Sequence, residues 1–254
     1  MVIEHIAGDL TCTVEAPTPL AELQQTLGRE GQMLALDPPD DGGLTVGETF
    51  DRALFGPRAH RYGLPRDLIL GVRVRLPDGT VARGGGKVVK NVAGYDLPKL
   101  LTGAHGRLGE LLHLTLRLHP LPRATATVIA PLQDPVPLER LTPACVDTDG
   151  ERLLVRFESP AAAALAEQAA GLLEEPETVG DDEALWEAHR ARQAGLHLHR
   201  CLPASAPQEL ARLSGWGVTR ITGRFARGWL FADVPAPARE VTALEQRVLE
   251  RLGV

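Results

Sequence analysis

The chain has 254 residues, a net charge of −6 and a pI near 5.8, and 44% of its residues are hydrophobic. This length suits one large domain or two small ones. The acidic balance argues against a nucleic-acid-binding protein, which usually shows a basic face. No apolar run approaches the roughly 20 residues of a membrane-spanning helix. We therefore expect neither a nucleic-acid partner nor a membrane span.

The N-terminus and the cysteines bear on the compartment. No basic segment followed by an apolar stretch begins the chain, so we expect no signal peptide. The three cysteines, Cys12, Cys145 and Cys201, are odd in number, far apart and form no CxxC pair. Reduced structural cysteines in a cytoplasmic protein are the simplest interpretation.

The first predicted elements alternate strands and turns. Residues 10–15 alternate and are rich in β-branched types, which predicts a strand, and residues 20–27 form an amphipathic pattern that predicts a helix. Residues 32–36 fit another strand. Residues 37–47 are dense in Asp, Pro and Gly, which indicates a loop.

A hairpin and one more strand follow. Residues 69–76 alternate as a strand, Pro77-Asp78-Gly79 is a tight turn, and residues 80–83 return. Residues 111–118 alternate again and end at Pro120 and Pro122. This proline pair is our predicted domain boundary, which divides the chain into residues 1–122 and 123–254.

Beyond the boundary the pattern becomes that of a smaller α+β unit. Ser159 and Pro160 have the types preferred at the N-cap and first position of an Ala-rich helix. We expect strands at 124–130, 152–157 and 228–234, and helices at 159–173, 183–193 and 235–252.

The most informative window spans residues 87–99. All three lysines of the chain, its only asparagine and one of its two tyrosines lie there, whereas the other 24 basic residues are arginines. A general bias toward arginine, with a few lysines left in this window by chance, is the alternative explanation. We favour a functional one, because three lysines and the only asparagine fall together.

Glycines surround this window. Residues 84–86 form a glycine run beside Lys87, which fits either an anion-binding nest of backbone N–H groups or a loose strand end. Asp96 is a predicted helix N-cap followed by proline. Further glycines at 103, 106 and 109 permit close backbone approach, so turns and a helix start here could pack against a flat cofactor.

At this point the residues carry a resemblance. The pattern Gly86-x-x-x-Lys90-Asn91-Val92-Ala93-Gly94-Tyr95-Asp96-Leu97, followed by Gly103-x-x-Gly106-x-Leu108-Gly109, resembles the flavin-binding core of vanillyl-alcohol-oxidase (PCMH-type) FAD domains. Within that family it is similar to the E subunits of bacterial glycolate oxidases. Weaker similarities are Pro38-Pro39-x-x-Gly42-x-x-Thr45-Val46-Gly47, Phe55–Arg58, Arg66–Val72 and Trp186-Glu-x-x-Arg190.

The resemblance implies an α+β fold: an FAD-binding subdomain with a mixed sheet and flanking helices, then a smaller cap domain. It implies FAD, oxidation of a small 2-hydroxy acid such as glycolate to glyoxylate, and a complex with a sister flavin subunit and an iron–sulfur subunit. The location would be cytoplasmic, or at a membrane through the partners. The cofactor-binding residues that it implies are Gly42, Gly43, Thr45, Gly47, Lys90, Asn91, Gly94, Tyr95, Asp96, Gly103, Gly106 and Gly109.

This sequence also departs from the family pattern. The family's Gly-rich pyrophosphate loop precedes the region matched here, and we expect it to be absent. Glu48 stands where a second glycine is usual, Ala104 where serine is common and Arg107 where threonine is common. A carboxylate facing a diphosphate is unfavourable, and Arg107 could either restore positive charge or be a surface residue.

These departures keep two alternatives open. The chain could be a shortened, flavin-free structural or assembly subunit of the same kind of complex. It could also bind FAD only when a partner chain supplies the missing loop. The sequence identifies no catalytic base.

Other polar clusters are weaker candidates. His197, His199 and Cys201 alternate as metal ligands on one strand face would, but alternating exposed residues fit better, and we predict no metal site. His105 fits either substrate contact or a solvent-facing loop. Asp40-Asp41 fits a turn, and the acidic run 181–183 fits the start of a helix.

Overall fold

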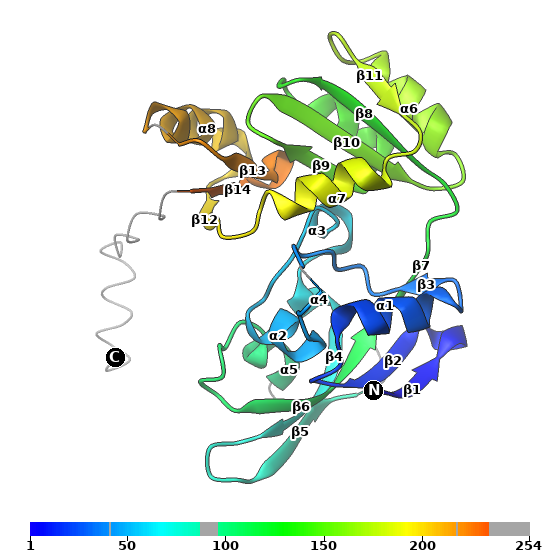
Figure 1. The fold of residues 1–254 in the computed structure, drawn as a ribbon, viewed down its shortest axis with the longest axis vertical. Coiled ribbons are helices and arrows are strands. Elements are labelled where there is room, and N and C mark those ends of the chain that lie inside the picture. Colours follow the sequence, from blue (N-terminus) through cyan, green and yellow to red (C-terminus); the bar gives the residue numbers. More distant parts are fainter. Residues whose placement is uncertain (41, 87–95, 217, 234–254) are drawn as a thin grey trace.

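The computed structural model describes residues 1–40, 42–86, 96–216 and 218–233. The predicted helix at 235–252 and most of the lysine window, residues 87–95, lie outside this part of the chain. In Figure 1 the described residues form two layered halves, one above the other.

The N-terminal half is built on a five-stranded antiparallel sheet, in the order β1-β2-β6-β4-β5 within the described residues. Its strands are β1 (Val2–Ile6), β2 (Thr11–Glu15), β4 (Ile69–Arg75), β5 (Val81–Gly85) and β6 (Glu110–Arg117). The last four confirm the predicted strands to within two residues at each end, and β4 and β5 form the predicted hairpin.

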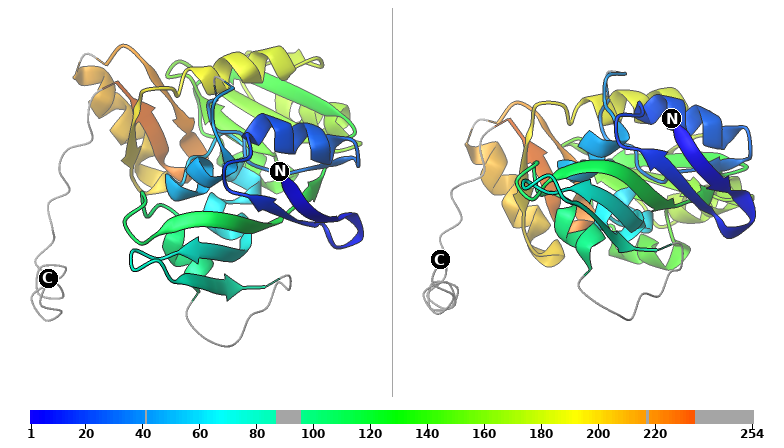
Figure 2. Two further views of the ribbon diagram at one scale, coloured as in Figure 1. Left: turned by 60° about the horizontal axis from the view of Figure 1, so that its bottom comes forward. Right: turned by 90° about the horizontal axis from the view of Figure 1, so that it is seen from below.

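Short helices cover the side of this sheet that faces the other half of the molecule (Figures 1 and 2). A single apolar core joins the sheet to them, with Leu23, Phe50 and Leu114 fully buried. The helices are α1 (Leu20–Gly28), α2 (Val46–Asp51), α3 (Ala59–Tyr62), α4 (Pro65–Leu68) and α5 (Leu97–Leu101), and a short 3-10 turn, η1 (Ala7–Asp9), links β1 to β2.

The predicted strand at 32–36 is shorter in the structure. Only β3 (Gln32–Met33) pairs, with β7 (His119–Pro120). Beyond Met33 the backbone bonds to the side-chain amide of Gln24 and not to another strand. Its Nε2 donates to the carbonyls of Leu34 and Leu36, and its Oε1 accepts from the N–H of Leu34. These bonds satisfy the backbone without a strand partner.

The second half contains a seven-stranded antiparallel sheet, in the order β11-β8-β10-β9-β13-β14-β12 within the described residues. The α+β class is therefore confirmed, while the strand pairs of both sheets are antiparallel and not mixed. The strands are β8 (Thr125–Pro131), β9 (Cys145–Thr148), β10 (Arg152–Glu158), β11 (Glu177–Val179), β12 (His197–Arg200), β13 (Ile221–Arg224) and β14 (Trp229–Ala232).

Two helices cover opposite faces of this second sheet. Val155 and Phe157 of β10 pack with α6 (Ala162–Ala170), whereas Leu154 packs with Trp186 of α7 (Glu183–Ala191). Strand side chains alternate between faces, so neighbours on β10 enter different cores. The remaining elements are α8 (Ala206–Gly215) and three 3-10 turns, η2 (Val136–Leu141), η3 (Pro203–Ser205) and η4 (Phe225–Arg227).

The predicted cap of the Ala-rich helix is wrong. Ser159 does not cap the helix, because its Oγ accepts a hydrogen bond from the N–H of Ala161 in a tight turn, and the helix begins at Ala162 without a side-chain cap. A serine hydroxyl bonded two residues onward competes with helix formation. The helix also ends at Ala170, one turn short of the predicted end.

The segment from Phe55 to Tyr62, which belongs to the N-terminal half, contacts the second half. The Arg58 Nε and the Tyr62 hydroxyl donate to the two carboxylate oxygens of Glu158 on β10, at 2.9 and 3.2 Å. Gln193 donates through Nε2 to the carbonyl oxygen of Phe55 at 2.9 Å. Phe55 also packs against Phe231 of β14, so polar and apolar contacts join the halves here.

No helix among the described residues has the length and hydrophobicity to cross a membrane. The three cysteines are free, as predicted, and Cys12 and Cys145 are buried.

Candidate functional site

A cleft of about 690 Å³ in the N-terminal half brings two of the predicted flavin loops together. Thr45 and Gly47 contribute from the loop that leads into α2, and Gly106 and Gly109 contribute from the turn before β6. Pro17, Leu76, Pro77 and Leu111 add apolar surface. Four residues predicted to bind the cofactor, separated by about 60 positions in the sequence, thus share one concave surface.

The loop before α2 is shaped by a capping box. Thr45 is the N-cap of the helix, its Oγ1 accepts from the N–H of Glu48, and the Glu48 carboxylate accepts from the N–H and hydroxyl of Thr45 at 2.9 and 2.8 Å. These hydrogen bonds hold the pKa of Glu48 below its usual value. The predicted loop at 37–47 therefore ends two residues early, because Val46 and Gly47 already belong to the helix.

Gly47 stands where a side chain would not fit. A Cβ at this position would lie 2.8 Å from the Cβ of Ala16, and the Gly47 N–H donates to the Ala16 carbonyl at 2.7 Å. The glycine allows helix α2 to start against the end of β2. Its amide is consequently engaged inside the protein.

The glycine turn before β6 is held by α2. The N–H groups of Gly103 and His105 donate to the carbonyls of Phe50 and Asp51, and the N–H of Gly106 donates to the Asp51 carboxylate at 2.7 Å. Gly103, Gly106 and Gly109 all have positive φ, where glycine is favoured. His105 also has a positive φ and is exposed, so the structure places it as a solvent-facing loop residue.

The charges of the cleft limit what it can hold. Glu48, Asp51 and Glu110 line it together with one cation, Arg75, whose Nη1 lies 2.6 Å from the Glu110 carboxylate. The amides of Gly47 and Gly106 already have acceptors. The described residues therefore fit a flat, uncharged ring system of FAD and not its diphosphate, which needs unpaired donors or positive charge.

The remaining predicted residues lie apart from this lining or outside the described chain. Asp96 caps α5 as expected, with its carboxylate accepting from the N–H of Lys99 and pairing with the Lys99 ammonium at 3.0 Å. Gly42 is exposed, and its N–H donates to Asp40, which is thus the predicted turn former. Gly43 is exposed as well. The residues that fall outside the described part are Lys90, Asn91, Gly94 and Tyr95.

The other departures from the family pattern and the glycine run also have structural explanations. Arg107 is exposed and donates through Nε to the carbonyl of Ala104. Gly84 and Gly85 end β5, and a Cβ at Gly85 would lie 2.1 Å from the Leu70 carbonyl oxygen. The run is therefore a closely packed strand end in the residues that the structure describes.

We expect the substitution Glu48→Gln to separate the contribution of this carboxylate to helix capping from the effect of its charge on flavin binding. The amide still accepts from Thr45, so the stability loss stays below about 1 kcal/mol. The affinity for FAD rises, because the diphosphate makes the whole cofactor negatively charged and the cleft that takes its ring then carries one carboxylate fewer. Chemical unfolding and flavin titration measure the two effects. Glu48→Ala, which removes the cap as well, is the matched control and loses about 0.5–2 kcal/mol. Unchanged flavin affinity in Glu48→Gln would contradict a flavin in this cleft.

The structure also places the weaker polar candidates, namely the histidines of β12 and the acidic run 181–183. His197 is exposed, but His199 is buried against Glu209, with Nδ1 3.8 Å from the carboxylate, so the expectation of alternating exposed residues is wrong for His199. No metal-binding group of three or more such ligands exists among the described residues. The acidic run 181–183 is the start of a helix, as predicted, because Asp182 is the N-cap residue of α7 and Glu183 lies in its first turn. Asp182 is also buried and accepts hydrogen bonds from Thr127 and Arg156.

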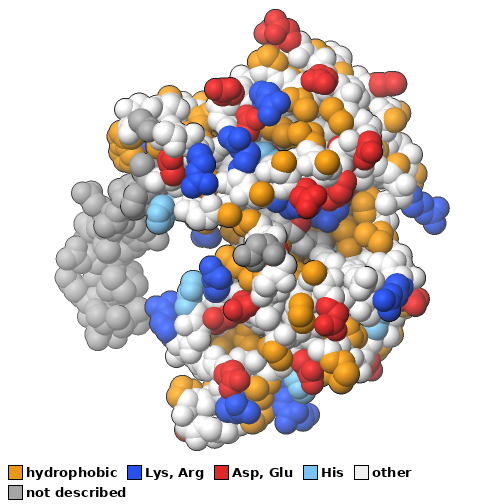
Figure 3. All heavy atoms as spheres, viewed as in Figure 1, with side chains coloured by type: hydrophobic (Ala, Val, Ile, Leu, Met, Phe, Trp, Pro, Cys, Tyr) orange, Lys and Arg blue, Asp and Glu red, His pale blue; other side chains and the backbone are white. Residues whose placement is uncertain are grey.

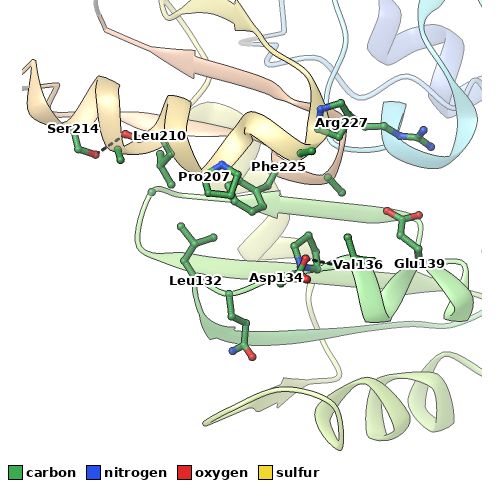
Figure 4. Close-up of a pocket in the computed structure, with 16 residues that line it drawn as sticks. Leu132, Asp134, Val136, Glu139, Pro207, Leu210, Ser214, Phe225 and Arg227 are labelled. Carbon is green, nitrogen blue, oxygen red and sulfur yellow. Dashed lines mark hydrogen bonds between the residues drawn. The ribbon is translucent and has the colours of Figure 1, made fainter.

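A second concavity, of about 980 Å³, lies between η2 and α8 in the second half. Figure 4 shows Leu132, Val136, Pro207, Leu210 and Phe225 around it. Its walls are mainly apolar, and none of the residues predicted to bind the cofactor lines it.

Sequence reasoning missed a polar pocket at the junction of the halves, lined by Asp37, Arg58 and Arg190. All three lie in or beside segments that carried the family resemblance, but no role was assigned to them. The available signal was their position: a buried acid before a proline pair and two arginines in matched motifs. Only folding brings these distant segments together.

Comparison with known proteins identifies the N-terminal segment. Residues 1–85 match the family described as FAD binding domain. The resemblance seen in the sequence is thereby confirmed, and the cleft contains Thr45 and Gly47 of this matched segment.

Individual relatives agree with this assignment. Glycolate oxidase subunit GlcE of Escherichia coli is 38% identical over 128 residues, which is 50% of this chain and 37% of that protein. Glycolate oxidase subunit GlcD of Bacillus subtilis is 32% identical over 51% of this chain and 27% of its own length. A mitochondrial D-lactate dehydrogenase of Saccharomyces cerevisiae is 32% identical over 50% of this chain and 22% of its own length. The matches thus span well under half of these relatives.

A solved structure shows the same fold over the whole chain. Alkyldihydroxyacetonephosphate synthase aligns with a TM-score of 0.64 at 15% sequence identity, covering 100% of this chain and 61% of that one. At this identity the likeness concerns the fold alone.

Proposed function

We propose that this chain is the FAD-binding subunit of a glycolate-oxidase-like complex that oxidises a small 2-hydroxy acid. The observation that carries the proposal is the FAD binding domain match over residues 1–85, whose residues Thr45 and Gly47 line one cleft together with Gly106 and Gly109. The relatives named above are the glycolate oxidase subunits GlcE and GlcD and a D-lactate dehydrogenase. Their names support flavin-dependent oxidation of a 2-hydroxy acid.

In this proposal the cofactor-binding set is the one that the resemblance implies. The redox chemistry would come from bound FAD, as the acceptor of a hydride. The chain orients the cofactor: glycines without side chains permit close approach, and Pro17, Leu76 and Leu111 exclude water from one face. We further propose that residues 1–122 form the flavin domain and residues 123–254 the cap, in a cytoplasmic complex with a sister flavin subunit and an iron–sulfur subunit.

One specific observation favours a second candidate, a flavin-free assembly subunit. Three carboxylates line the cleft, and the amides of Gly47 and Gly106 are engaged. A diphosphate bound there would lack donors and meet negative charge.

The visible spectrum of the purified chain, before and after excess FAD and desalting, tests both candidates. We expect the chain to bind flavin, so that absorption bands at about 370 and 450 nm remain after desalting. A colourless protein after this treatment contradicts flavin binding by the chain alone. Repeating the reconstitution with the sister subunit then distinguishes the flavin-free subunit from one whose site a partner completes.

A further inference from the structure

A polar pocket of about 420 Å³ lies at the junction of the two halves, away from the flavin cleft residues. Its walls come from α1, the segment from Met33 to Asp40, Arg58, Leu121 and α7. Figure 3 shows acidic and basic side chains together where α7 faces the N-terminal half. A pocket of this size suits a small molecule.

Arg58 presents two unpaired Nη groups to this pocket. Its Nε donates to Glu158, whose side chain is fully buried, and this fixes the plane of the guanidinium group. No acceptor in the described part of the chain takes a hydrogen bond from the two Nη groups of Arg58. A planar guanidinium with unpaired Nη groups is suited to bind a carboxylate.

Asp37 supplies the second polar group. The side chain of Asp37 lines the pocket, and its Oδ1 accepts a hydrogen bond from the N–H of Arg58 at 3.0 Å. The residue is only 9% exposed, and it forms no ion pair with a described residue. Burial raises the pKa of Asp37 to about 6, against the opposing effect of Arg58, Arg190 and Arg224. Near neutral pH this carboxyl can therefore gain or lose a proton, which is typical of groups in functional pockets.

The other charged groups of the pocket are already paired. Arg190 donates to Glu183 at 3.0 Å, and Glu183 also accepts from Arg156 at 2.8 Å. The Asp40 carboxylate accepts from the N–H groups of Gly42 and Leu44. Arg58 and Asp37 are thus left to meet a ligand, beside the Nε and Nη1 groups of Arg190, from which no described residue accepts a hydrogen bond. The apolar wall includes Leu20, Met33 and Leu121.

We propose that this pocket binds a small carboxylate anion, with the Nη groups of Arg58 holding its oxygens and protonated Asp37 donating a further hydrogen bond. A second negative charge beside an ionised Asp37 would be repelled, so the bound anion favours the protonated acid. Binding therefore takes up about one proton at a pH above the pKa of free Asp37. The affinity falls about tenfold for each pH unit above about 6.

Isothermal titration of the full chain with acetate and with glycolate, from pH 5.5 to 8.5 at constant ionic strength, tests the proposal. We expect saturable binding with this pH dependence. Asp37→Asn keeps a donor that does not titrate, so binding persists with a flat pH profile. Arg58→Lys keeps the charge but not the planar fork, and we expect at least a tenfold loss of affinity.

Tyr62→Phe is the matched control, because it removes the other hydrogen bond to Glu158 without changing the pocket lining; it should bind as the wild type does. Equal binding of acetate and glycolate assigns the site to the carboxylate group, and binding of glycolate alone makes the hydroxyl part of the ligand. Absence of saturable binding by either, binding of phosphate in their place, or an unchanged pH profile in Asp37→Asn overturns the proposal. The test does not depend on flavin, so its failure is distinct from failure of the proposed function.

Discussion

Replacing Arg156 with alanine is expected to destabilise the protein by about 3–5 kcal/mol. The guanidinium group is 2% exposed and lies 2.8 Å from the buried Asp182 and 3.6 Å from the buried Glu158. Removing it leaves Asp182 buried without a cation, whereas Glu158 keeps its ion pair with Arg58. An uncompensated buried charge is far more unfavourable than the loss of one contact. Chemical unfolding followed by circular dichroism measures the change.

The same strand provides the control. Arg152 also pairs with an aspartate, Asp149, at 2.7 Å, but its side chain is 52% exposed. Arg152→Ala should therefore change the free energy of unfolding by no more than about 1 kcal/mol. Equal losses in the two variants would show that the buried network contributes no more than a surface ion pair.

Gly56→Ala is the second substitution with a large expected effect. A Cβ on Gly56 would lie 1.7 Å from the carbonyl oxygen of Asp37 and 2.4 Å from its carbonyl carbon. Backbone atoms cannot move aside as a flexible side chain can, so we expect a loss of about 3 kcal/mol or more. The displaced Asp37 should also abolish carboxylate binding in the junction pocket.

Gly8→Ala is the matched control, because a Cβ there meets no atom within 4 Å. Its stability should stay within about 0.5–1 kcal/mol of the wild type, the cost of most surface substitutions. Heat unfolding and acetate titration compare the two variants. A Gly56→Ala protein with wild-type stability and binding would contradict the close approach of residues 37 and 56.

The cleft in which we propose that flavin binds could be anticipated in part from the sequence. The glycines at 103, 106 and 109 and the Thr45–Gly47 loop matched a family pattern, and the structure places four of these residues on one concave surface. The sequence analysis missed the role of Glu48, although Thr45-x-x-Glu48 has the residue types and the spacing of a capping box. In the structure it completes a capping box with Thr45.

The sequence alone predicted the strands β2, β4, β5, β6, β8, β10 and β14 and the helices α1, α5, α6 and α7, because alternation of period 2 and apolar stripes are local properties of the chain. It did not predict β1, β9, β11 and β13 or the helices α2, α3, α4 and α8. The sequence also carried the resemblance to FAD binding domains, which the match over residues 1–85 confirms. Tertiary structure alone decided that Asp182 and His199 are buried, and that Asp37, Arg58 and Arg190 line one pocket. Burial and pairing of charges depend on which distant segments pack together, and no local pattern encodes that.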